Sequence, residues 1–238
     1  MVDLESSDGL TVLTIDRPHA RNAIALSTMG ELEEALDAAA GAQALVIRGG
    51  GDRAFVSGGD LKELSALRTT EEAAGMAARM RAICDRIAAF PAPVIAALNG
   101  HALGGGAEVA VAADIRIAAD DIKIGFNQVS LEIMPAWGGA ERLAALVGKS
   151  KALLLAGSGT ILTAGDAERW GLIDRVVPRA SFDDEWRTLA RSLANRPAGK
   201  IKKVIGGVTP NEAIDAFAEL WVSDEHWEAA DRVMNRAK

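Results

Sequence analysis

The sequence predicts an α/β fold with a helical tail. Strand-like and helix-like segments are intermixed over about three quarters of the chain, as is typical of α/β proteins. The strand-like segments are short apolar or alternating runs between turn residues, whereas the helix-like segments repeat apolar residues at steps of three and four. From Ser181 to the end the pattern is helical. The 238 residues suit one large domain, or one domain with an appended tail.

The first half of the chain supplies its elements in a regular order. Residues 10–15 alternate and predict a strand, and residues 27–40 predict an amphipathic helix with Ser27 as its N-cap. The apolar run 44–48 predicts a buried strand, which a glycine-rich turn follows. A second helix is predicted to begin at Thr70, and two prolines end it.

The second half starts with the strand-like run 94–98, which leads into a glycine-rich segment. Beyond it, two alternating runs predict strands, two periodic runs predict helices, and an apolar run predicts the last strand. In chain order these are residues 114–118 and 122–126, then 139–147 and 150–156, then 172–177. The prediction is a mixed core over residues 1–180 and a helical region over residues 181–238.

The composition argues against several classes of function. The chain carries 33 acidic and 26 basic residues, a net charge of −7, which disfavours nucleic acid and an anionic membrane surface as partners. Cys84 is the only cysteine, so no internal disulfide is expected, and the three histidines lack metal-ligand spacing. The sequence has no apolar run long enough to span a bilayer and no signal-peptide pattern, which predicts a cytoplasmic protein.

The segment NGHALGGGAEVAVAADIRIA, residues 99–118, places three consecutive glycines before a lone glutamate. A helix is predicted to begin near Gly104 to Gly106, where the first N–H groups have no helical acceptor and the helix end carries partial positive charge. Glycine lets a ligand oxygen approach that backbone closely. Glu108 lies on the same face, three residues after Gly105, so the segment predicts a site that polarises a carbonyl and moves a proton. The alternative is that the glycines serve packing and that Glu108 compensates the helix dipole.

A second glycine loop has the same layout. In AFVSGGDLKEL, residues 54–64, Gly58 and Gly59 precede Asp60, which is well placed to cap the helical pattern that follows. Two such loops, each after a buried strand, predict two backbone N–H donors aimed at one oxygen. Each donor of such an oxyanion hole stabilises a transition state by about 2.7–4 kcal/mol. A turn and a helix cap would account for this loop by itself.

Four motifs in chain order resemble the crotonase superfamily, also called the enoyl-CoA hydratase/isomerase family. They are RPHARNA at residues 17–23, AFVSGGDLKEL at 54–64, NGHALGGGAEVAVAADIRIA at 99–118 and MPAWGGAERL at 134–143. TAGDAERWGLIDRVV at 163–177 is similar to the family's next segment. The resemblance implies a crotonase-like spiral of ββα units for residues 1–180. It also implies that residues 181–238 are the helices through which such proteins form homotrimers or dimers of trimers.

The resemblance implies a role for each matching residue. Gly59 and Gly105 match the two oxyanion-hole donors, and Glu108 matches one of the two glutamates that hydratases use around the catalytic water. The residues that match positions near the CoA thioester are Ala20, Arg21, Ala23, Gly58, Gly59, Asp60, Leu61, Lys62, Gly104, Gly105 and Trp137. The expected substrate is an acyl-CoA thioester, as in fatty acid metabolism, and no metal or cofactor is expected beyond CoA itself.

The second hydratase glutamate is replaced in this chain. Counted from Glu108, the family pattern puts it at position 128, which is Gln128 here. A carboxamide hydrogen-bonds to water or substrate but does not exchange a proton as a carboxyl group does. Glu132 would restore a carboxylate only if the chain curls there, and we expect it on the surface. Trp137 adds bulk where many relatives have a smaller residue, for packing or, as in some decarboxylase-like members, for the reaction.

The predicted function is therefore that of an enoyl-CoA hydratase-like lyase. Gly59 and Gly105 would bind the thioester oxygen, and Glu108 would act as the acid and base. The loss of the second carboxylate leaves three alternatives open: an enoyl-CoA isomerase, an acyl-CoA decarboxylase, or a family member that binds acyl-CoA without turning it over.

Overall fold

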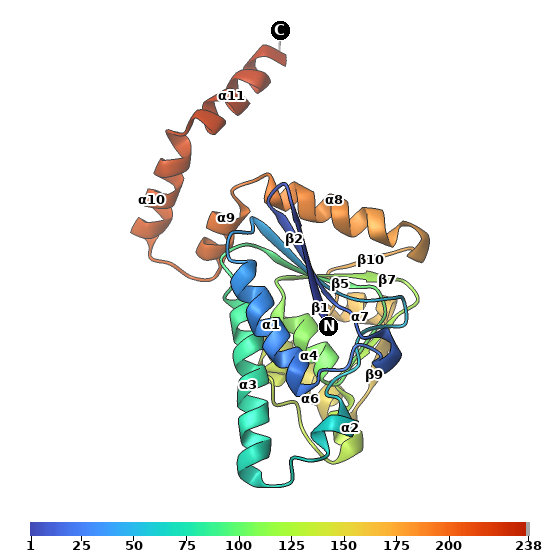
Figure 1. Ribbon diagram of the computed structural model, residues 1–238. Helices are drawn as coiled ribbons and strands as arrows, with labels where there is room; N and C mark the ends of the chain where they lie inside the picture. Colours follow the sequence, from blue (N-terminus) through green and yellow to red (C-terminus); the bar gives the residue numbers. More distant parts are fainter. Residues whose placement is uncertain (237–238) are drawn as a thin grey trace.

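The computed structural model describes residues 1–236, which form two sheets surrounded by helices (Figure 1). The larger sheet comprises β1 (Val2–Ser7), β2 (Leu10–Ile15), β3 (Ala44–Gly49), β5 (Val94–Leu98), β7 (Ile115–Ala119) and β10 (Arg175–Val177), side by side in this order. The smaller sheet comprises β4 (Ala54–Val56), β6 (His101–Leu103), β8 (Lys123–Gly125) and β9 (Ile161–Thr163), also in this order. Among the strands of these described residues, β1 with β2 and β8 with β9 pair antiparallel, and the other neighbours pair parallel.

The chain winds as a spiral because it passes repeatedly from the larger sheet to the smaller one. β3 leads to β4, β5 to β6 and β7 to β8. After β4 come α2 (Leu61–Leu64) and α3 (Thr70–Ala88), and after β6 comes α4 (Gly105–Ala112). The predicted α/β fold of ββα units is therefore confirmed.

The helices bury the faces that their apolar residues predict. α1 (Leu26–Ala38) buries Met29, Leu32 and Leu36, and it lies alongside α3. All eight residues of α4 are buried, because this helix of small apolar residues contacts α3, β4 and β6 at once. The remaining elements before the tail are α5 (Gly139–Val147), α6 (Lys149–Ser158), α7 (Ala164–Trp170) and the 3₁₀ helices η1 (Pro18–Ala20), η2 (Asn127–Leu131) and η3 (Arg179–Ser181).

The structure corrects the prediction in two respects, the number of strands and the N-cap of α1. Four strands were missed: β4, β6 and β9 have three residues each, too short for a period to be visible, and β1 is a polar edge strand. Ser27 is wrong as the N-cap of α1, since the helix begins at Leu26 and Ala25 occupies the cap position. The side chain of Glu63, from α2, accepts the N–H of Leu26 over 3.1 Å. A distant residue thus supplies the cap that local sequence assigns to a serine.

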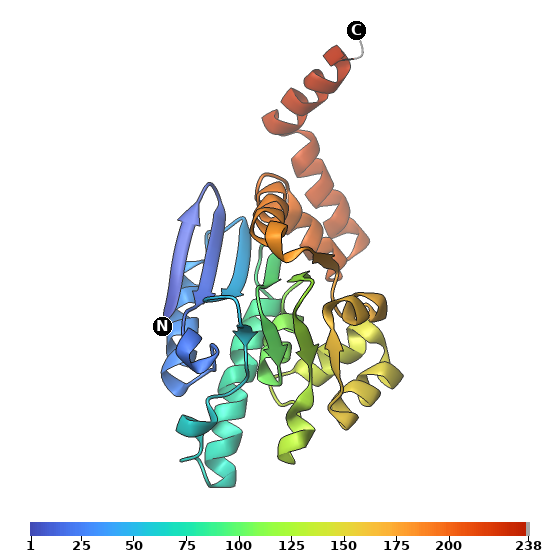
Figure 2. The same ribbon diagram turned by 90° about the vertical axis from the view of Figure 1, so that its right-hand side faces the viewer.

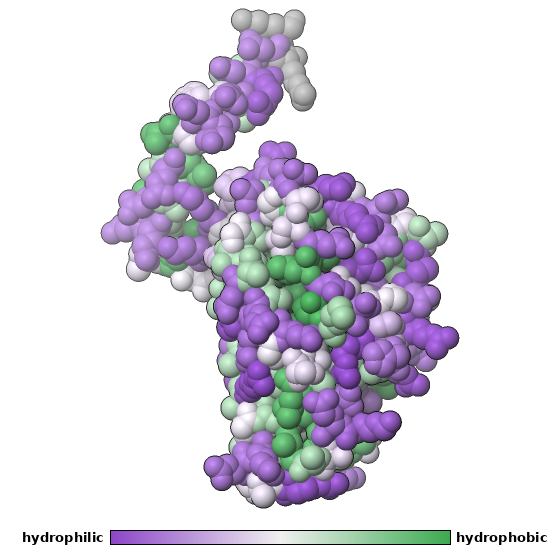
Figure 3. Space-filling view, in the orientation of Figure 1, coloured by the Kyte–Doolittle hydropathy of each residue, from purple (hydrophilic) through white to green (hydrophobic). Residues whose placement is uncertain are grey.

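The helical tail leaves the body of the molecule after its second helix, because Lys202 of that helix still pairs with Asp114. α8 (Phe182–Ala194) packs against the larger sheet and buries Phe182 and Trp186. α9 (Ala198–Ile205) follows, and α10 (Pro210–Trp221) and α11 (Asp224–Arg236) extend away from the body (Figures 1 and 2). Apolar side chains remain exposed along α10 and α11 (Figure 3). They are Ile214, Phe217, Trp221, Trp227, Val233 and Met234. None of the helices described in residues 1–236 has the length and apolarity needed to cross a membrane.

Candidate active site

The two glycine loops lie side by side because the strands before them, β4 and β6, are parallel neighbours. Parallel strands end at the same edge of a sheet, so the loops that leave them start next to each other. Gly58 has φ +100°, and a Cβ built on it would lie only 3.3 Å from the backbone N of Gly105. The structure thus brings the loop of Gly58 and Gly59 against the start of α4.

The N–H groups of Gly59 and Gly105 have no acceptor within residues 1–236. Gly105 is the first residue of α4, so its N–H precedes the helical hydrogen bonds. On either side of Gly59, the backbone pairs with Ile24. The N–H of Ile24 donates to the carbonyl oxygen of Gly58, and the N–H of Asp60 donates to the carbonyl oxygen of Ile24, both over 2.8 Å, so the N–H of Gly59 takes no part in this pairing. Gly105 is buried and Gly59 is half-buried. Because buried N–H groups are nearly always paired, the free N–H of Gly105 next to that of Gly59 indicates a place for a ligand oxygen.

At each of the three positions 104, 105 and 106, a different structural feature favours glycine. Gly104 has φ +54°, a conformation that side chains disfavour. A Cβ on Gly106 would lie 1.8 Å from the carbonyl oxygen of Val56, so this glycine lets α4 approach β4. A Cβ on Gly105 would lie 2.1 Å from Cζ3 of Trp137. Close packing therefore accounts for the glycine at position 106. Gly105, by contrast, carries the free N–H itself and lies against the indole ring of Trp137.

Glu108 is 2% exposed and is held by three donors. Its Oε2 accepts the backbone N–H of Trp137 over 2.7 Å and that of Gly139 over 2.9 Å. Its Oε1 accepts Nε2 of Gln128 over 2.9 Å. Burial raises the pKa of Glu108, and the donated N–H groups partly oppose that rise. A buried carboxyl group with a raised pKa, next to free N–H groups, is a candidate for proton exchange.

Gln128 lies in η2 and is buried beside Glu108, at 7% exposure. Its Nε2 is occupied by Glu108, but its Oε1 is buried and has no hydrogen-bond partner within residues 1–236. The carboxamide therefore donates to Glu108 through Nε2, whereas its Oε1 is free to accept a hydrogen bond. Glu132, by contrast, is exposed and has φ +56°, so Gln128 and not Glu132 is the neighbour of Glu108.

Trp137 covers the glycine loops with its indole ring. The ring lies against Gly105, and its Cζ2 is 3.9 Å from the place of a Cβ on Gly59. Leu64 approaches the same place, with Cδ1 at 2.7 Å. Trp137 is 6% exposed, so the ring forms an apolar wall beside the two free N–H groups.

The residues expected near CoA also lie at the first glycine loop. The side chain of Arg17 links two parts of this group, because it donates to the carbonyl oxygen of Ala23 over 2.5 Å and to the carboxylate of Asp60 over 3.0 Å. The Arg17 guanidinium and the N–H groups of α2 hold the pKa of Asp60 below its usual range despite desolvation. The segment that contains Ala20, Arg21 and Ala23 is thus attached to Asp60.

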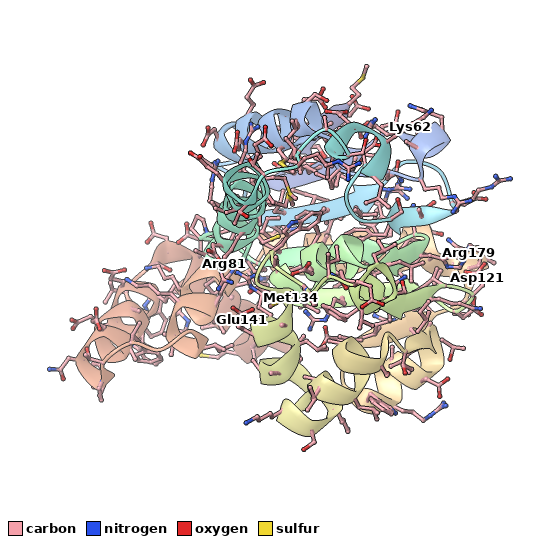
Figure 4. The ribbon with its side chains drawn as sticks, turned by 90° about the horizontal axis from the view of Figure 1, so that it is seen from below. Lys62, Arg81, Asp121, Met134, Glu141 and Arg179 are labelled. Atoms are coloured by element: carbon pink, nitrogen blue, oxygen red, sulfur yellow. The ribbon has the colours of Figure 1, made fainter. Side chains whose placement is uncertain are left out.

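Leu61 and Lys62 are exposed at the start of α2, and Figure 4 shows Lys62 at the edge of the molecule. Arg21 lines two neighbouring cavities of about 560 and 230 Å³. The larger one is also lined by Ser57 and Leu103, which adjoin the glycine loops, and by an ion pair of Arg179 with Asp121 (Figure 4). No group of three or more His, Cys, Asp or Glu side chains in residues 1–236 is arranged to hold a metal ion.

Sequence reasoning missed the backbone donors to Glu108. The turn at residues 137–139 supplies two of them, and Arg142, one helical turn later, donates to the carbonyl of Trp137 over 3.2 Å. The only local indication was PAWGG itself, whose two glycines allow a tight turn. That this turn faces Glu108 depends on the three-dimensional arrangement and not on a local pattern.

The sequence is similar to those of known enoyl-CoA hydratases and isomerases. The family model described as enoyl-CoA hydratase/isomerase matches residues 5–209. A probable enoyl-CoA hydratase of Bacillus subtilis is 41% identical over 199 residues, covering 82% of this chain and 76% of that protein. The crotonyl-CoA hydratase of Syntrophomonas wolfei is 36% identical over 225 residues, covering 93% of this chain and 85% of that protein.

Solved structures show the same fold over nearly the whole chain. The crystal structure of an enoyl-CoA hydratase from Bacillus anthracis superposes with a TM-score of 0.90 at 26% identity, covering 99% of this chain and 96% of that one. A putative enoyl-CoA hydratase/isomerase from Mycobacterium abscessus gives 0.90 at 28% identity, covering 99% and 97%. The chain therefore belongs to the enoyl-CoA hydratase/isomerase family of the crotonase superfamily.

Proposed function

We propose that the protein is a hydratase that adds water to a 2-enoyl-CoA thioester, with Glu108 as its one proton-transferring group. The observation that carries this proposal is the buried carboxyl group of Glu108 beside two free N–H groups, those of Gly59 and Gly105. The names of the relatives, among them a crotonyl-CoA hydratase, support the same substrate class.

The reaction starts with the thioester carbonyl oxygen accepting both N–H groups. As water attacks C3, negative charge moves through C2 onto that oxygen, where the two donors and the N-terminus of α4 stabilise it. The Glu108 carboxylate takes one proton from the water during this attack. The same carboxyl group then gives that proton to C2, so the water ends as a hydroxyl on C3 and a hydrogen on C2.

Gln128 completes this arrangement without exchanging a proton. Its Nε2 holds Oε1 of Glu108 over 2.9 Å, and its free Oε1 accepts a hydrogen bond from the attacking water. Trp137 excludes bulk water from the side of Gly105. Residues 20–23 and Asp60 to Lys62 would contact the CoA part, and no cofactor beyond CoA takes part.

The same site could serve the alternative reactions. Moving a proton between two carbons of an enoyl thioester needs one carboxyl group, and an enolate left by decarboxylation needs one proton donor. A protein that only binds acyl-CoA would keep the free N–H groups and lose turnover. These alternatives differ in their products, so product analysis separates them.

The test is incubation of the pure protein with crotonyl-CoA, followed by the absorbance of the conjugated thioester and the mass of the product. A gain of one water supports the proposal. An unchanged mass with loss of the conjugated absorbance contradicts it in favour of an isomerase, and an unchanged mass and absorbance with CoA binding intact contradict it in favour of a binding protein. Glu108→Gln is expected to lower the rate by about 100-fold or more. Glu132→Gln, at an exposed site, is the matched control and is expected to keep the wild-type rate.

We also propose a homotrimer or a dimer of trimers, located in the cytoplasm. The apolar side chains exposed along α10 and α11, including Phe217 and Trp221, support an assembly that covers them. Analytical ultracentrifugation measures the number of copies directly.

A further inference from the structure

We propose that Arg142 is a positioning residue: it holds the turn at residues 137–139 so that the turn's two N–H groups donate to Glu108. The inference deepens the proposed function and rests on Glu108 being the group that exchanges the proton. Arg142 itself does not contact Glu108 through a hydrogen bond, and it acts through the backbone of Trp137.

Arg142 connects two helices to this turn. From α5, its Nη1 donates to the carbonyl oxygen of Trp137 over 3.2 Å, and its Nη2 donates to Oδ1 of Asp85, on α3, over 2.5 Å. The Arg142 side chain is 20% exposed, whereas Asp85 is 54% exposed. The ion pair with Asp85 therefore orients the largely buried guanidinium of Arg142, and its Nη1 is directed at the carbonyl oxygen of Trp137.

The carbonyl that Arg142 binds lies between the two donating N–H groups in the chain. The N–H of Trp137 and that of Gly139 both point at Oε2 of Glu108, and the peptide between residues 137 and 138 links them. Gly138 has φ +86°, and a Cβ on it would lie 2.3 Å from Nη1 of Arg142. The turn is thus shaped around the guanidinium. Fixing the peptide plane between residues 137 and 138 restricts the N–H groups on either side to rotations about the backbone bonds that flank this plane.

The turn decides how well the buried carboxylate is stabilised. Burial raises the pKa of Glu108, and the N–H groups of Gly139 and Trp137 are the strongest effects that oppose the rise. If the turn loosens, the pKa of Glu108 rises further and less carboxylate is present to take a proton from water. Activity is then lost on the acid side of the pH profile.

Other groups near Glu108 provide a matched control. Arg81 and Cys84 of α3 are close enough to Glu108 to interact electrostatically, and burial raises the pKa of Cys84 to about 12, so it stays neutral. Arg81 pairs with Asp85 and with Glu141 of α5, near Arg142, but donates to no backbone atom of the turn (Figure 4). Arg81→Gln therefore removes a nearby cation without releasing the turn.

The experiment compares wild type, Arg142→Gln, Arg142→Lys and Arg81→Gln. In Arg142→Gln, the acid limb of the pH profile of kcat/KM is expected to move to higher pH, with about tenfold lower activity on that limb. In Arg81→Gln the profile is expected to stay close to that of the wild type. Arg142→Lys keeps the charge but not the two-pronged contact, and its profile is expected to lie between the two. Circular dichroism checks that each variant folds.

A second readout does not depend on turnover. The carboxyl carbon of Glu108, assigned by its loss in Glu108→Gln, is titrated by ¹³C NMR in the same proteins. A raised pKa of Glu108 in Arg142→Gln but not in Arg81→Gln supports the inference, even if crotonyl-CoA is not hydrated and the proposed function fails. Equal pKa values in all folded variants, or equal shifts in Arg142→Gln and Arg81→Gln, would overturn it.

Discussion

Gln128 donates its Nε2 to Oε1 of Glu108 over 2.9 Å, so the two residues form a pair of one carboxylate and one carboxamide. Both side chains are buried, and the Oε1 of Gln128 has no partner within residues 1–236. A carboxyl group can exchange protons, whereas a carboxamide only forms hydrogen bonds that orient them. The proposed reaction follows from this asymmetry, and it makes the predictions below specific to this chain.

A second carboxylate at position 128 is expected to speed hydration. In Gln128→Glu, two carboxyl groups within hydrogen-bond distance would share a proton and titrate at separate pKa values, which supplies an acid and a base together. We expect an initial rate on crotonyl-CoA about tenfold higher at neutral pH. Gln43→Glu, at an exposed position, is the control. A rate equal to or below that of wild type would mean that the carboxamide already does what the reaction requires.

The contribution of Glu108 to the stability of the protein is expected to fall as the pH rises past the ordinary pKa of this group. Because burial raises this pKa above 4.5, the folded protein binds the Glu108 proton more tightly than the unfolded chain does. The contribution of Glu108 to stability is therefore fully present below 4.5 and is lost between that value and the raised pKa of the folded state. Glu108→Gln has no carboxyl group at this position and does not show this loss. The Tm of the variant minus the Tm of the wild type should therefore increase from acidic to neutral pH. A constant difference in Tm across this range contradicts the prediction.

The glycines of α4 are expected to differ in how they tolerate a methyl group. In Gly105→Ala the added Cβ meets the ring of Trp137 at 2.1 Å, and in Gly106→Ala it meets the carbonyl oxygen of Val56 at 1.8 Å. Since a ring moves more readily than a backbone, we expect a cost of about 1–3 kcal/mol for Gly105→Ala and a larger one for Gly106→Ala. Urea unfolding measures both.

A double variant and a control complete this comparison. Adding Trp137→Ala removes the clash and should make Gly105→Ala nearly neutral relative to Trp137→Ala alone, which itself costs about 3–5 kcal/mol. Gly75 on α3 has no atom within 4 Å of a built Cβ, so Gly75→Ala is expected to keep or slightly raise stability. Additive effects of Gly105→Ala and Trp137→Ala would contradict the contact between them.

The exposed aromatic residues of the tail are expected to hold the proposed assembly together. Phe217 and Trp221 are 60% and 47% exposed, with ring centroids 5.6 Å apart on α10. Replacing both by lysine should convert the assembly to monomers, because their apolar surface would no longer be buried between copies. Sedimentation velocity reports the change. Lys203→Ala, an exposed polar site on α9, should leave the assembly intact.

Most of the fold was predictable because its signals are local. The apolar runs of β2, β3 and β5 and the periodic helices α1 and α3 are visible in windows of a few residues. The short strands β4 and β6 were not visible, although their parallel pairing is what brings the glycine loops together. The N-cap of α1 was missed for a similar reason, since Glu63 supplies it from another helix.

The sequence by itself determined which groups the site has available: two glycine loops, the carboxyl group of Glu108 and the carboxamide of Gln128. Only the tertiary structure decided which groups meet. The N–H groups of Trp137 and Gly139 reach Glu108, and Arg142 reaches both that turn and Asp85, because α3, α4 and α5 pack together. Hydrogen bonds form at about 3 Å and depend on direction, so contacts between separate helices are set by how those helices pack and leave no periodic trace in the sequence.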